Sequence, residues 1–556
     1  MRPLRLGALL TLALGPLAAC GDDASPATTA DTSDTANEVD NDTVDTPETD
    51  VDPGPPGPRA FVWPVAPGVS EAVEEVTLRH LPEDYSVLTG PFARVRSCTP
   101  DLERGKRSTF EFGDQSMEVV SCVPEARALP GDDGTYRHIT PPATPAEDDG
   151  RFAEVMMYHH MQVIHDYYKD LYGLTERDHP LEALTNVQTW TDYCDGWSGI
   201  ANAAYVPYEA LNYFVTGLDF GGIGGDAIVF SGTADKNFSF DASVIYHEYT
   251  HAILGATRLN ATFIDAQGIN NLPGALNEAY ADYFAATQTG EPLVGGYALN
   301  DLAAADYCGI VDTEEPTENY ARDLTATRRC PDDLVAEVHV DSEVFSAALW
   351  AIREEFGKYE ADNIIMYAVT QLVQTSDFDS AAATTIQAAL EVYGESARAR
   401  VEAIFAERNL VRCDRAIPIE KVGLRGIPLR HEGTRNFDPN PFPGWVPGYL
   451  QYKVEVPANT RIVTLTLDAR AGFGGQSPLE MEAAFKHGGD PIYYTSNLGA
   501  GRGRHDSNLI VPVNETKQVV LEAGEGQALT PGTWVFALHN KGRRTVRVSG
   551  ITAAFE

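Results

Sequence analysis

The stretch Tyr246-His247-Glu248-Tyr249-Thr250-His251 decides how the rest of the chain is interpreted. It lies in an apolar run, 242–254, without glycine or proline, and such a run predicts a buried helix. On a helix His247 and His251 project from one face about a turn apart, so two imidazoles can bind one tetrahedral zinc ion. Glu248 lies about 100° further around, where it can accept a proton from metal-bound water. Two histidines and a glutamate also occur on helices by chance, so this stretch alone does not establish a metal site.

A second segment supplies a further ligand. Pro273-Gly274 is followed by another run free of glycine and proline, 275–286, in which Glu278 and Asp282 are four residues apart on one face. A third protein ligand, followed by a carboxylate that orients a coordinating histidine, is the arrangement that a catalytic zinc needs. A solvated acidic face is the alternative, but the run is mostly apolar. Together the two segments predict a Zn²⁺ site formed by His247, His251 and Glu278.

Both segments resemble those of thermolysin-type metallopeptidases, or gluzincins, a group that includes the fungalysins. The matching residues are H-E-Y-T-H at 247–251 and N-E-x-x-x-D at 277–282. A metzincin would have a histidine where Thr257 stands, and an aminopeptidase-like spacing would place a glutamate near Asn270. The loop 255–273 is longer than in thermolysin and closer to that of a fungalysin, so this loop departs from the thermolysin pattern.

The resemblance covers about 152–410 and implies a multidomain α+β fold. We expect a thermolysin-like catalytic unit, with a β-rich N-terminal lobe and a helical C-terminal lobe, followed by an all-β sandwich. The expected boundaries are 1–19 for a lipoprotein signal peptide, 20–59 for a disordered acidic tether, 60–150 for a strand-rich lead-in to the N-terminal lobe, 151–412 for the catalytic domain, 413–448 for a linker and 449–556 for the sandwich.

The resemblance also assigns roles around the metal. Asn202 and Ala203 match the edge strand that holds the backbone of a peptide substrate. Arg322 lies in the segment that contacts the substrate carbonyl, and His339, in H-V-D-S-E-V-F, would donate a hydrogen bond to the transition-state oxyanion. The resemblance further implies that Glu248 is the general base and that Asn277 and Asp282 orient the coordinating imidazoles.

Two features of the family are missing or unplaced. The position four residues before His247 often holds a calcium-binding aspartate, but here it is Ser243, so a calcium site is doubtful. The tyrosine that assists the oxyanion histidine would lie in the altered loop, where Phe263 is the nearest aromatic residue and has no hydroxyl.

Several helices are expected around these segments. The apolar face of 151–172 predicts a helix whose His159, His160 and His165 pack and hydrogen-bond rather than bind metal. The segment 338–342 is expected to open a helix that runs to about Phe356, with Asp341 or Ser342 as its N-terminal cap. Further helices are expected at 364–374, 380–393 and 396–406.

The composition excludes some classes of partner. The chain has 556 residues, with 41 Lys and Arg against 81 Asp and Glu, and a formal net charge of -40. Its length allows two or three domains. A surface this acidic repels phosphate, which argues against a nucleic-acid partner.

The N-terminus has the features of an export signal. Arg2 and Arg5 precede the apolar run 6–17, which is too short to span a membrane stably. Leu17-Ala-Ala-Cys20 resembles a lipobox, which predicts lipidation of Cys20 and anchoring to a bacterial membrane, at the outer membrane or cell surface, with release also possible. A plain signal-peptide cleavage site is the alternative. Gly21, next to the cysteine, leaves the sorting open.

The six other cysteines suggest three disulfides in an exported chain. We expect the pairs Cys98–Cys122, Cys308–Cys330 and Cys194–Cys413, although spacing does not fix connectivity. The lead-in 60–150 contains β-prone runs separated by turns, and a short pro-segment is its alternative. This assignment leaves no room for the long propeptide of thermolysin relatives.

Alternating strands in 449–556 predict an antiparallel sandwich. Pro531-Gly-Thr-Trp-Val-Phe536 resembles part of the prepeptidase C-terminal domains of secreted proteases. We therefore expect a monomeric, exported zinc endopeptidase acting on peptides or proteins. The alternative is a catalytically impaired surface lipoprotein on a peptidase scaffold that binds protein or glycan.

Overall fold

The computed structural model describes residues 57–556 apart from 83–85, 113–114, 176, 200, 209–222, 224, 256–258, 303–307, 309–318, 423–426, 430–445, 472–479, 496–503, 508 and 542–545. The predicted signal peptide, Cys20 and nearly all of the tether lie outside the described residues. Among the residues described, no helix is both long and apolar enough to cross a membrane.

The N-terminal lobe is built on a five-stranded sheet with the order β10-β11-β7-β3-β6. The three central strands run parallel, and the two edge strands, β10 and β6, are antiparallel to their neighbours. β7 is buried along its whole length, as is typical of a central parallel strand, and its buried Glu182 is paired with Arg94 and Arg96. The strands are β3 (Ala93–Thr99), β6 (Val123–Glu125), β7 (Leu181–Thr185), β10 (Ala203–Val206) and β11 (Ala227–Phe230).

A second sheet and a short hairpin complete this lobe. The four-stranded sheet has the order β4-β5-β8-β9, and β1 pairs with β2. Their bounds are β1 (Arg59–Val62), β2 (Glu74–Thr77), β4 (Arg107–Phe112), β5 (Gln115–Ser121), β8 (Gln188–Thr191) and β9 (Gly196–Gly199).

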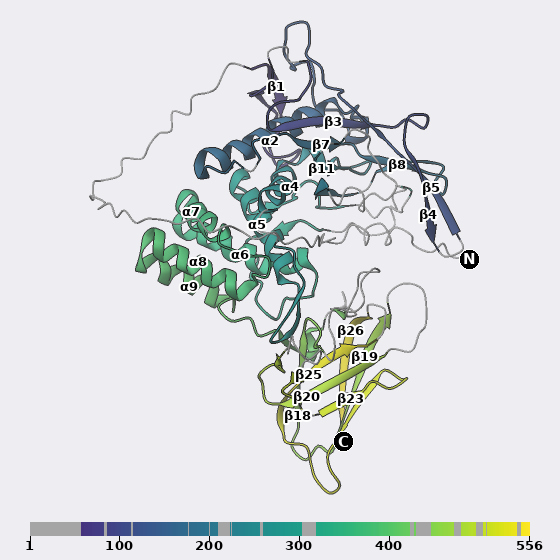
Figure 1. The fold of residues 1–556 in the computed structure, drawn as a ribbon, viewed down its shortest axis with the longest axis vertical. Helices are drawn as coiled ribbons and strands as arrows, with labels where there is room; N and C mark the ends of the chain where they lie inside the picture. Colours follow the sequence, from purple (N-terminus) through teal and green to yellow (C-terminus); the bar gives the residue numbers. More distant parts are fainter. Residues whose placement is uncertain are drawn as a thin grey trace, which may run out of the picture.

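Helix α2 (Arg151–Tyr172) covers the five-stranded sheet and touches both β3 and β7 (Figure 1). The helix predicted at 151–172 is confirmed. Its Glu154 is fully buried, and its carboxylate accepts hydrogen bonds from the backbone N–H groups of Ser97, Arg127 and Ala128. One side chain therefore accepts from three backbone donors, one in β3 and two in the segment after β6.

The helical lobe follows, with α4 packed against α5 and α5 against α6. In Figure 1 it lies between the N-terminal sheets and the C-terminal sandwich. Its helices are α4 (Ala242–Leu254), α5 (Leu272–Thr289), α6 (Val338–Phe356), α7 (Lys358–Val369), α8 (Phe378–Tyr393) and α9 (Glu395–Glu407). Its strands are β12 (Phe263–Asp265), β13 (Gly268–Asn270), β14 (Leu293–Val294) and β15 (Arg322–Asp323). Short 3-10 turns lie at Pro145–Glu147, Phe238–Phe240 and Ile419–Lys421.

The start of α6 differs from the prediction. Neither Asp341 nor Ser342 caps the helix: the capping residue is Glu337, whose carboxylate accepts from the backbone N–H of Val340. Asp341 lies inside the first turn and accepts instead from the N–H groups before the helix, at Val335 and Ala336. The carboxylate turns backward because those donors have no helical acceptor.

The C-terminal region is a two-sheet sandwich, and the predicted multidomain α+β class is confirmed. The sheets have the orders β16-β18-β25-β20-β23 and β17-β26-β19-β24. The segment 413–448, expected as a linker, supplies one strand to each sheet, β16 and β17. The strands are β16 (Ala416–Pro418), β17 (Ile427–Leu429), β18 (Gln451–Val456), β19 (Ile462–Ala471), β20 (Met481–His487), β23 (Leu509–Pro512), β24 (Gln518–Glu522), β25 (Gly532–Asn540) and β26 (Val546–Phe555), with a separate pair β21 (Tyr494–Thr495) and β22 (Arg504–His505).

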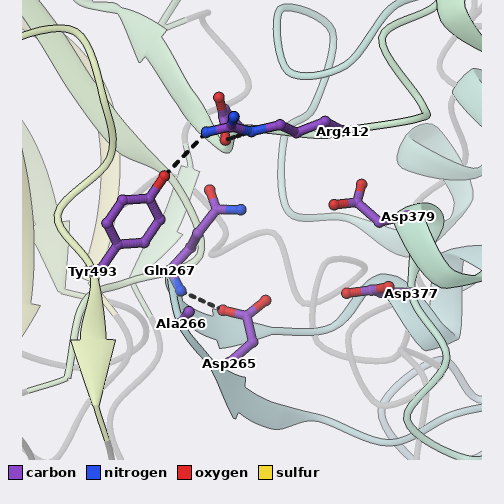
Figure 2. Close-up of a pocket in the computed structure, with 8 residues that line it drawn as sticks. Asp265, Ala266, Gln267, Asp377, Asp379, Arg412 and Tyr493 are labelled. Atoms are coloured by element: carbon purple, nitrogen blue, oxygen red, sulfur yellow. Dashed lines mark hydrogen bonds and ion pairs between the residues drawn. The ribbon is translucent and has the colours of Figure 1, made fainter.

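The sandwich is joined to the helical lobe at the β12–β13 hairpin. Tyr494 donates from its backbone N–H to the carbonyl of Ala266, and Ile269 donates to that of Pro447. Beside these contacts lies a pocket of about 330 Å³, and Figure 2 shows side chains of the hairpin, α8 and the sandwich around it. The helical lobe and the sandwich are thus joined by hydrogen bonds as well as by the connecting chain.

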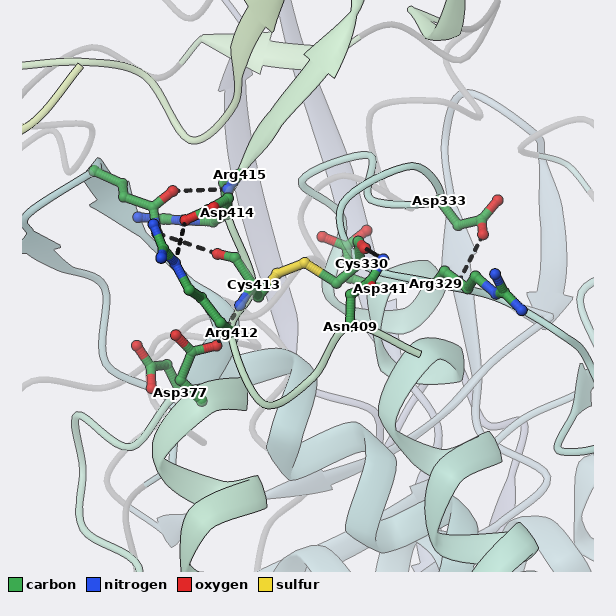
Figure 3. Close-up of a disulfide and its surroundings, with 12 residues drawn as sticks. Arg329, Cys330, Asp333, Asp341, Asp377, Asn409, Arg412, Cys413, Asp414 and Arg415 are labelled. Carbon is green, nitrogen blue, oxygen red and sulfur yellow. Dashed lines mark hydrogen bonds and ion pairs between the residues drawn. A yellow bond between two sulfur atoms is a disulfide. The ribbon is translucent and has the colours of Figure 1, made fainter. Parts of the chain in front are cut away.

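The cysteines pair partly as expected. Cys98–Cys122 is present, but the other two predicted pairs are wrong: the structure joins Cys194 to Cys308 and Cys330 to Cys413. Figure 3 shows Cys330 beside Asn409, whose amide donates to the Cys330 carbonyl. The fold brings the segment after α9 against Cys330, which sequence spacing does not reveal.

Replacing Glu154 tests the link between α2 and the sheet. Glu154→Ala leaves two buried N–H groups and one part-buried N–H group without their acceptor, so we expect the free energy of unfolding to fall by about 3 kcal/mol. Glu154→Gln keeps one acceptor oxygen and should lose less. Urea unfolding followed by circular dichroism measures both, and an unchanged midpoint for the alanine variant would contradict this role.

Asp341 predicts a pH dependence of stability. Burial raises the pKa of Asp341 to about 7, although the Val335 N–H, the Tyr449 hydroxyl and the Ala336 N–H lower it. A raised folded-state pKa stabilises the protein below the unfolded value of about 4, and this stabilisation is lost as the pH rises through about 7. Asp341→Asn should show a smaller fall in unfolding free energy between pH 5 and pH 8. Equal falls in both proteins, measured by urea titration, would count against this assignment.

Candidate metal centre

The helix that carries the first two ligands is fixed at its start by Asp241. This buried carboxylate caps α4 by accepting from the Ser243 N–H and hydroxyl, and it also accepts from the N–H groups of Tyr297 and Ala298. Ser243 in turn accepts from the N–H of Gly295 at 2.9 Å. The side chain at the doubtful calcium position is therefore engaged in hydrogen bonds that tie α4 to the loop after α5.

His247, His251 and Glu278 converge between α4 and α5. Each offers a ligand atom, and these atoms all lie within 4.8 Å of one another. The Nε2 atoms of the two histidines are 3.0 Å apart, and the carboxylate of Glu278 lies 3.2 Å from His247 Nε2 and 3.6 Å from His251 Nε2. Packing of α4 against α5 brings the distant glutamate to the histidine pair.

The donor set fits a divalent cation. Glu278 Oε2 is buried and has no hydrogen-bond partner. Burial raises the pKa of Glu278, but His339, His251 and His247 outweigh it and hold the pKa well below its usual value, so the group is ionised. Two imidazole nitrogens with one carboxylate match the donor set of a catalytic zinc, which keeps a fourth position for water.

The other ring nitrogens of the two histidines also have partners. His251 Nδ1 lies 2.6 Å from Asn277 Oδ1, and His247 Nδ1 lies 2.9 Å from Asp282 Oδ1. A donor bond from each Nδ1–H fixes the tautomer in which Nε2 presents its lone pair to a metal. The structure thus places Asn277 and Asp282 where the resemblance implied they would act.

Arg322, on β15, contacts both Asp282 and His247. Its Nε donates to Asp282 Oδ1 at 2.6 Å, and its Nη2 lies 3.2 Å from His247 Nδ1. Ser342 of α6 donates to the second oxygen of Asp282 at 3.3 Å. Arg322 therefore reaches the metal centre and shares the buried carboxylate with a ligating imidazole.

Glu248 lies beside the centre and is bound by a residue that sequence reasoning missed. Its Oε2 accepts from the backbone N–H of Tyr205 at 2.6 Å, and the residue is only 7% exposed. A backbone donor carries no residue-type signal, so only the contact between α4 and β10 could reveal this bond. Strand β10 thereby orients the carboxylate next to the ligands.

His339, at the start of α6, is also brought to the centre. Its Nε2 lies 3.7 Å from Glu278 Oε1, and its Nδ1 lies 2.7 Å from the Glu337 carboxylate. The side chain is 43% exposed, more open than the three ligands. Glu337, which sequence reasoning also missed, both caps the helix and orients this imidazole.

Asn202 and Ala203 reach the site through the same edge strand. Asn202 Oδ1 accepts from the Ala203 N–H at 2.9 Å, and β10 pairs with β11 on its inner side. The Tyr205 N–H that binds Glu248 points outward, and alternate residues of a strand share this direction. The main chain of Ala203 therefore faces the same outer edge.

The remaining histidines do not join the cluster. His160 is bonded to the Tyr246 hydroxyl and the Trp63 carbonyl, and His165 to Asp178. His159 is half-buried in the same helix, where desolvation of the ring holds its pKa well below its usual value. Phe263 lies in β12, and a tyrosine for the oxyanion is not identified by a contact among the residues described.

Comparisons with known proteins agree with this geometry. A family model described as "Thermolysin metallopeptidase, alpha-helical domain" matches residues 269–410, a range that includes Glu278, Arg322 and His339. The chain is 27% identical over 263 residues to an "Extracellular elastase" of Staphylococcus epidermidis, covering 45% of each protein. It is 24% identical over 295 residues to a "Thermolysin" of Alicyclobacillus acidocaldarius subsp. acidocaldarius, covering 48% of this chain and 47% of that protein.

A solved structure, the precursor of protealysin, a metalloproteinase from Serratia proteamaculans, is similar with 15% identity and a TM-score of 0.33, covering 49% of this chain and 82% of that one. The chain spans about half the length of the curated relatives it matches. The predicted resemblance to thermolysin-like metallopeptidases is confirmed by the family model and the curated relatives.

Asn277 provides a test of the metal centre. Asn277→Ala removes the acceptor of His251 Nδ1–H, so we expect zinc affinity to fall by about 10- to 100-fold. Asn277→Asp keeps an acceptor oxygen and should retain the affinity. Competition with a chromogenic chelator measures both, and equal affinities for wild type and the alanine variant would contradict the orienting role.

Proposed function

We propose that this chain, whose helical lobe resembles that of thermolysin, is an exported zinc-dependent endopeptidase that acts on peptides or proteins. The observation that carries the proposal is the convergence of His247, His251 and Glu278 beside a buried Glu248. A scaffold without catalysis has no use for a carboxylate held in this position. The name of the elastase relative, which includes the word extracellular, supports the exported setting.

Zinc bound to this set would supply a Lewis acid and lower the pKa of a bound water toward neutrality. Glu248 accepts the proton of the attacking water and passes it to the leaving amine nitrogen. The Tyr205 N–H keeps the carboxylate oriented between these two transfers. Each transfer then starts from a fixed geometry.

The edge strand β10 binds the substrate backbone. An extended peptide adds alongside the outer edge, where the carbonyl of Ala203 accepts a hydrogen bond and the Asn202 side chain supplies a further contact. The two N–H groups at this edge are already bound, by Asn202 and Glu248. Recognition therefore relies on the acceptors of the strand and on the Asn202 amide.

His339 and Arg322 stabilise the negative charge that develops on the carbonyl oxygen. His339 is open to the substrate side and is held by Glu337. Arg322 is fixed by Asp282, which leaves its position independent of the substrate. Asp282 and Asn277 keep the two ligating imidazoles in the tautomer that the metal needs.

Export and anchoring complete the proposal. The signal segment 1–19 directs secretion, Cys20 carries the lipid, and the acidic tether holds a monomeric enzyme away from the membrane surface. The sandwich acts as an accessory domain. The competing function is an anchored, catalytically impaired scaffold that binds protein or glycan. A zinc-loaded wild type without peptidase activity in the following test would support this alternative.

The isosteric variant Glu248→Gln decides between hydrolysis and binding alone. Glutamine still accepts from Tyr205 but takes up no proton, so kcat/KM on casein or a fluorogenic peptide should fall by about 10²- to 10⁴-fold. Zinc content, measured by atomic absorption, should stay at one ion per chain. Chelation should abolish wild-type activity, and zinc should restore it. Full activity of the variant, or a zinc-loaded wild type that leaves peptides intact, would refute the proposal.

A further inference from the structure

The β12–β13 hairpin is held by one buried arginine from the start of the sandwich. Arg415 is 1% exposed, and its Nη2 donates to both carboxylate oxygens of Asp265 at 2.6 Å. Its Nη1 donates to the carbonyl of Ile269 at 2.7 Å, and its backbone N–H donates to the side chain of Gln267. A single residue therefore contacts both strands of the hairpin and the turn between them.

The hairpin leads directly into α5, which carries Glu278. Asn270, the last residue of β13, donates to Asp265 Oδ2 at 2.8 Å and accepts from the backbone N–H of Leu272 at 2.9 Å. Leu272 is the first residue of α5. A continuous set of hydrogen bonds thus connects Arg415 to the N-terminus of the helix that presents the third ligand.

A second contact reaches the start of α6. Tyr449, from the sandwich side, lies with its ring 5.3 Å from the Arg415 guanidinium, and its hydroxyl donates to Asp341 Oδ2 at 2.8 Å. Asp341 is two residues beyond His339 and also binds the backbone that enters the helix. The same junction therefore fixes the segment that carries His339.

The turn of the hairpin leaves no room for a side chain against the sandwich. Gly268 has φ +123°, and a Cβ there would lie 2.5 Å from the carbonyl oxygen of Pro447. Gly290, at the other end of α5, also has a positive φ, of +78°, but a Cβ there would meet nothing within 4 Å. A side chain would strain the backbone at either glycine, because both have a positive φ. Only at Gly268 would it also clash with the sandwich.

We infer that the C-terminal sandwich is a positioning part of the metal centre: Arg415 sets Glu278 through the hairpin, and Tyr449 sets His339 through Asp341. The inference rests on the proposed function, and it deepens the accessory role expected for the sandwich. Arg415 and Tyr449 are positioning residues, because each acts through another group and touches neither metal nor substrate.

The matched pair Gly268→Ala and Gly290→Ala tests this in the full chain. Both should lose thermal stability, Gly268→Ala the more because of its clash with Pro447, but only Gly268→Ala should weaken zinc binding, by about 10-fold or more. Only Gly268→Ala should change the visible absorption of the cobalt-substituted protein, which reports ligand geometry. Equal zinc affinities and equal spectra for the two variants would overturn the inference.

Tyr449→Phe supplies a second, milder variant, so a failure of Gly268→Ala to fold does not end the test. It keeps the ring over Arg415 and removes the bond to Asp341. We expect kcat to fall and the pH profile to shift, with KM and zinc affinity unchanged. Arg412→Met is the control, since Arg412 contacts Asp414 and Tyr493 at the same junction, outside the hairpin (Figure 2). Identical kinetics of Tyr449→Phe and this control would overturn the role of Tyr449.

The outcomes for the function and for the inference are separable. A wild type that binds zinc or cobalt but cleaves no peptide refutes the proposed function, while the affinity and spectra of the glycine variants still decide the inference. A wild type that binds neither ion overturns both.

Discussion

The carboxylate of Asp282 is the interaction on which the architecture of the site depends. It is fully buried and is contacted by His247 of α4, Arg322 of β15 and Ser342 of α6. Four elements therefore meet at one charge, and the nearby guanidinium offsets the cost of burying it. Loss of Arg322 leaves an uncompensated charge in the core, so the residues proposed as metal ligands are held by the same carboxylate that joins these elements.

The metal centre also depends on both lobes. The helical lobe supplies all three proposed ligands, whereas the N-terminal lobe contributes the edge strand whose Tyr205 N–H binds Glu248. This division places the proposed base at the boundary between the lobes.

The sequence was most informative where the relevant contacts repeat with the period of a helix. His247 and His251, and likewise Glu278 and Asp282, are four residues apart, so local geometry alone put each pair on one face. The resemblance supplied the pairing between the two helices, and the multidomain α+β class followed from it. Asn277 lies where the motif placed it, against His251.

Contacts without a periodic signal were missed. The bond from the Tyr205 backbone to Glu248 involves no side-chain donor, and the ion pair between Arg415 and Asp265 joins residues 150 positions apart. Two of the three disulfides were mispaired as well, because spacing favoured the near pair Cys308–Cys330 and so left Cys194 and Cys413 to each other, whereas tertiary packing joins Cys194 to Cys308 and Cys330 to Cys413. The cap of α6 was also missed: Glu337 is an uncommon capping residue, and the expected Asp341 was already occupied by the chain before it.

The outer edge of β10 also bears on whether copies of the chain can pair with one another. A free strand edge is a template on which another copy of the chain can pair, and such pairing leads to oligomers and fibres. Here the outward N–H groups of Ala203 and Tyr205 are already occupied by Asn202 and Glu248. The edge at which we propose that an extended peptide binds is thus a poor pairing site for a strand of a second copy of the chain, and the acidic composition adds mutual repulsion. On the exported, anchored enzyme that we propose, the bond that orients Glu248 also keeps neighbouring copies from pairing along this strand.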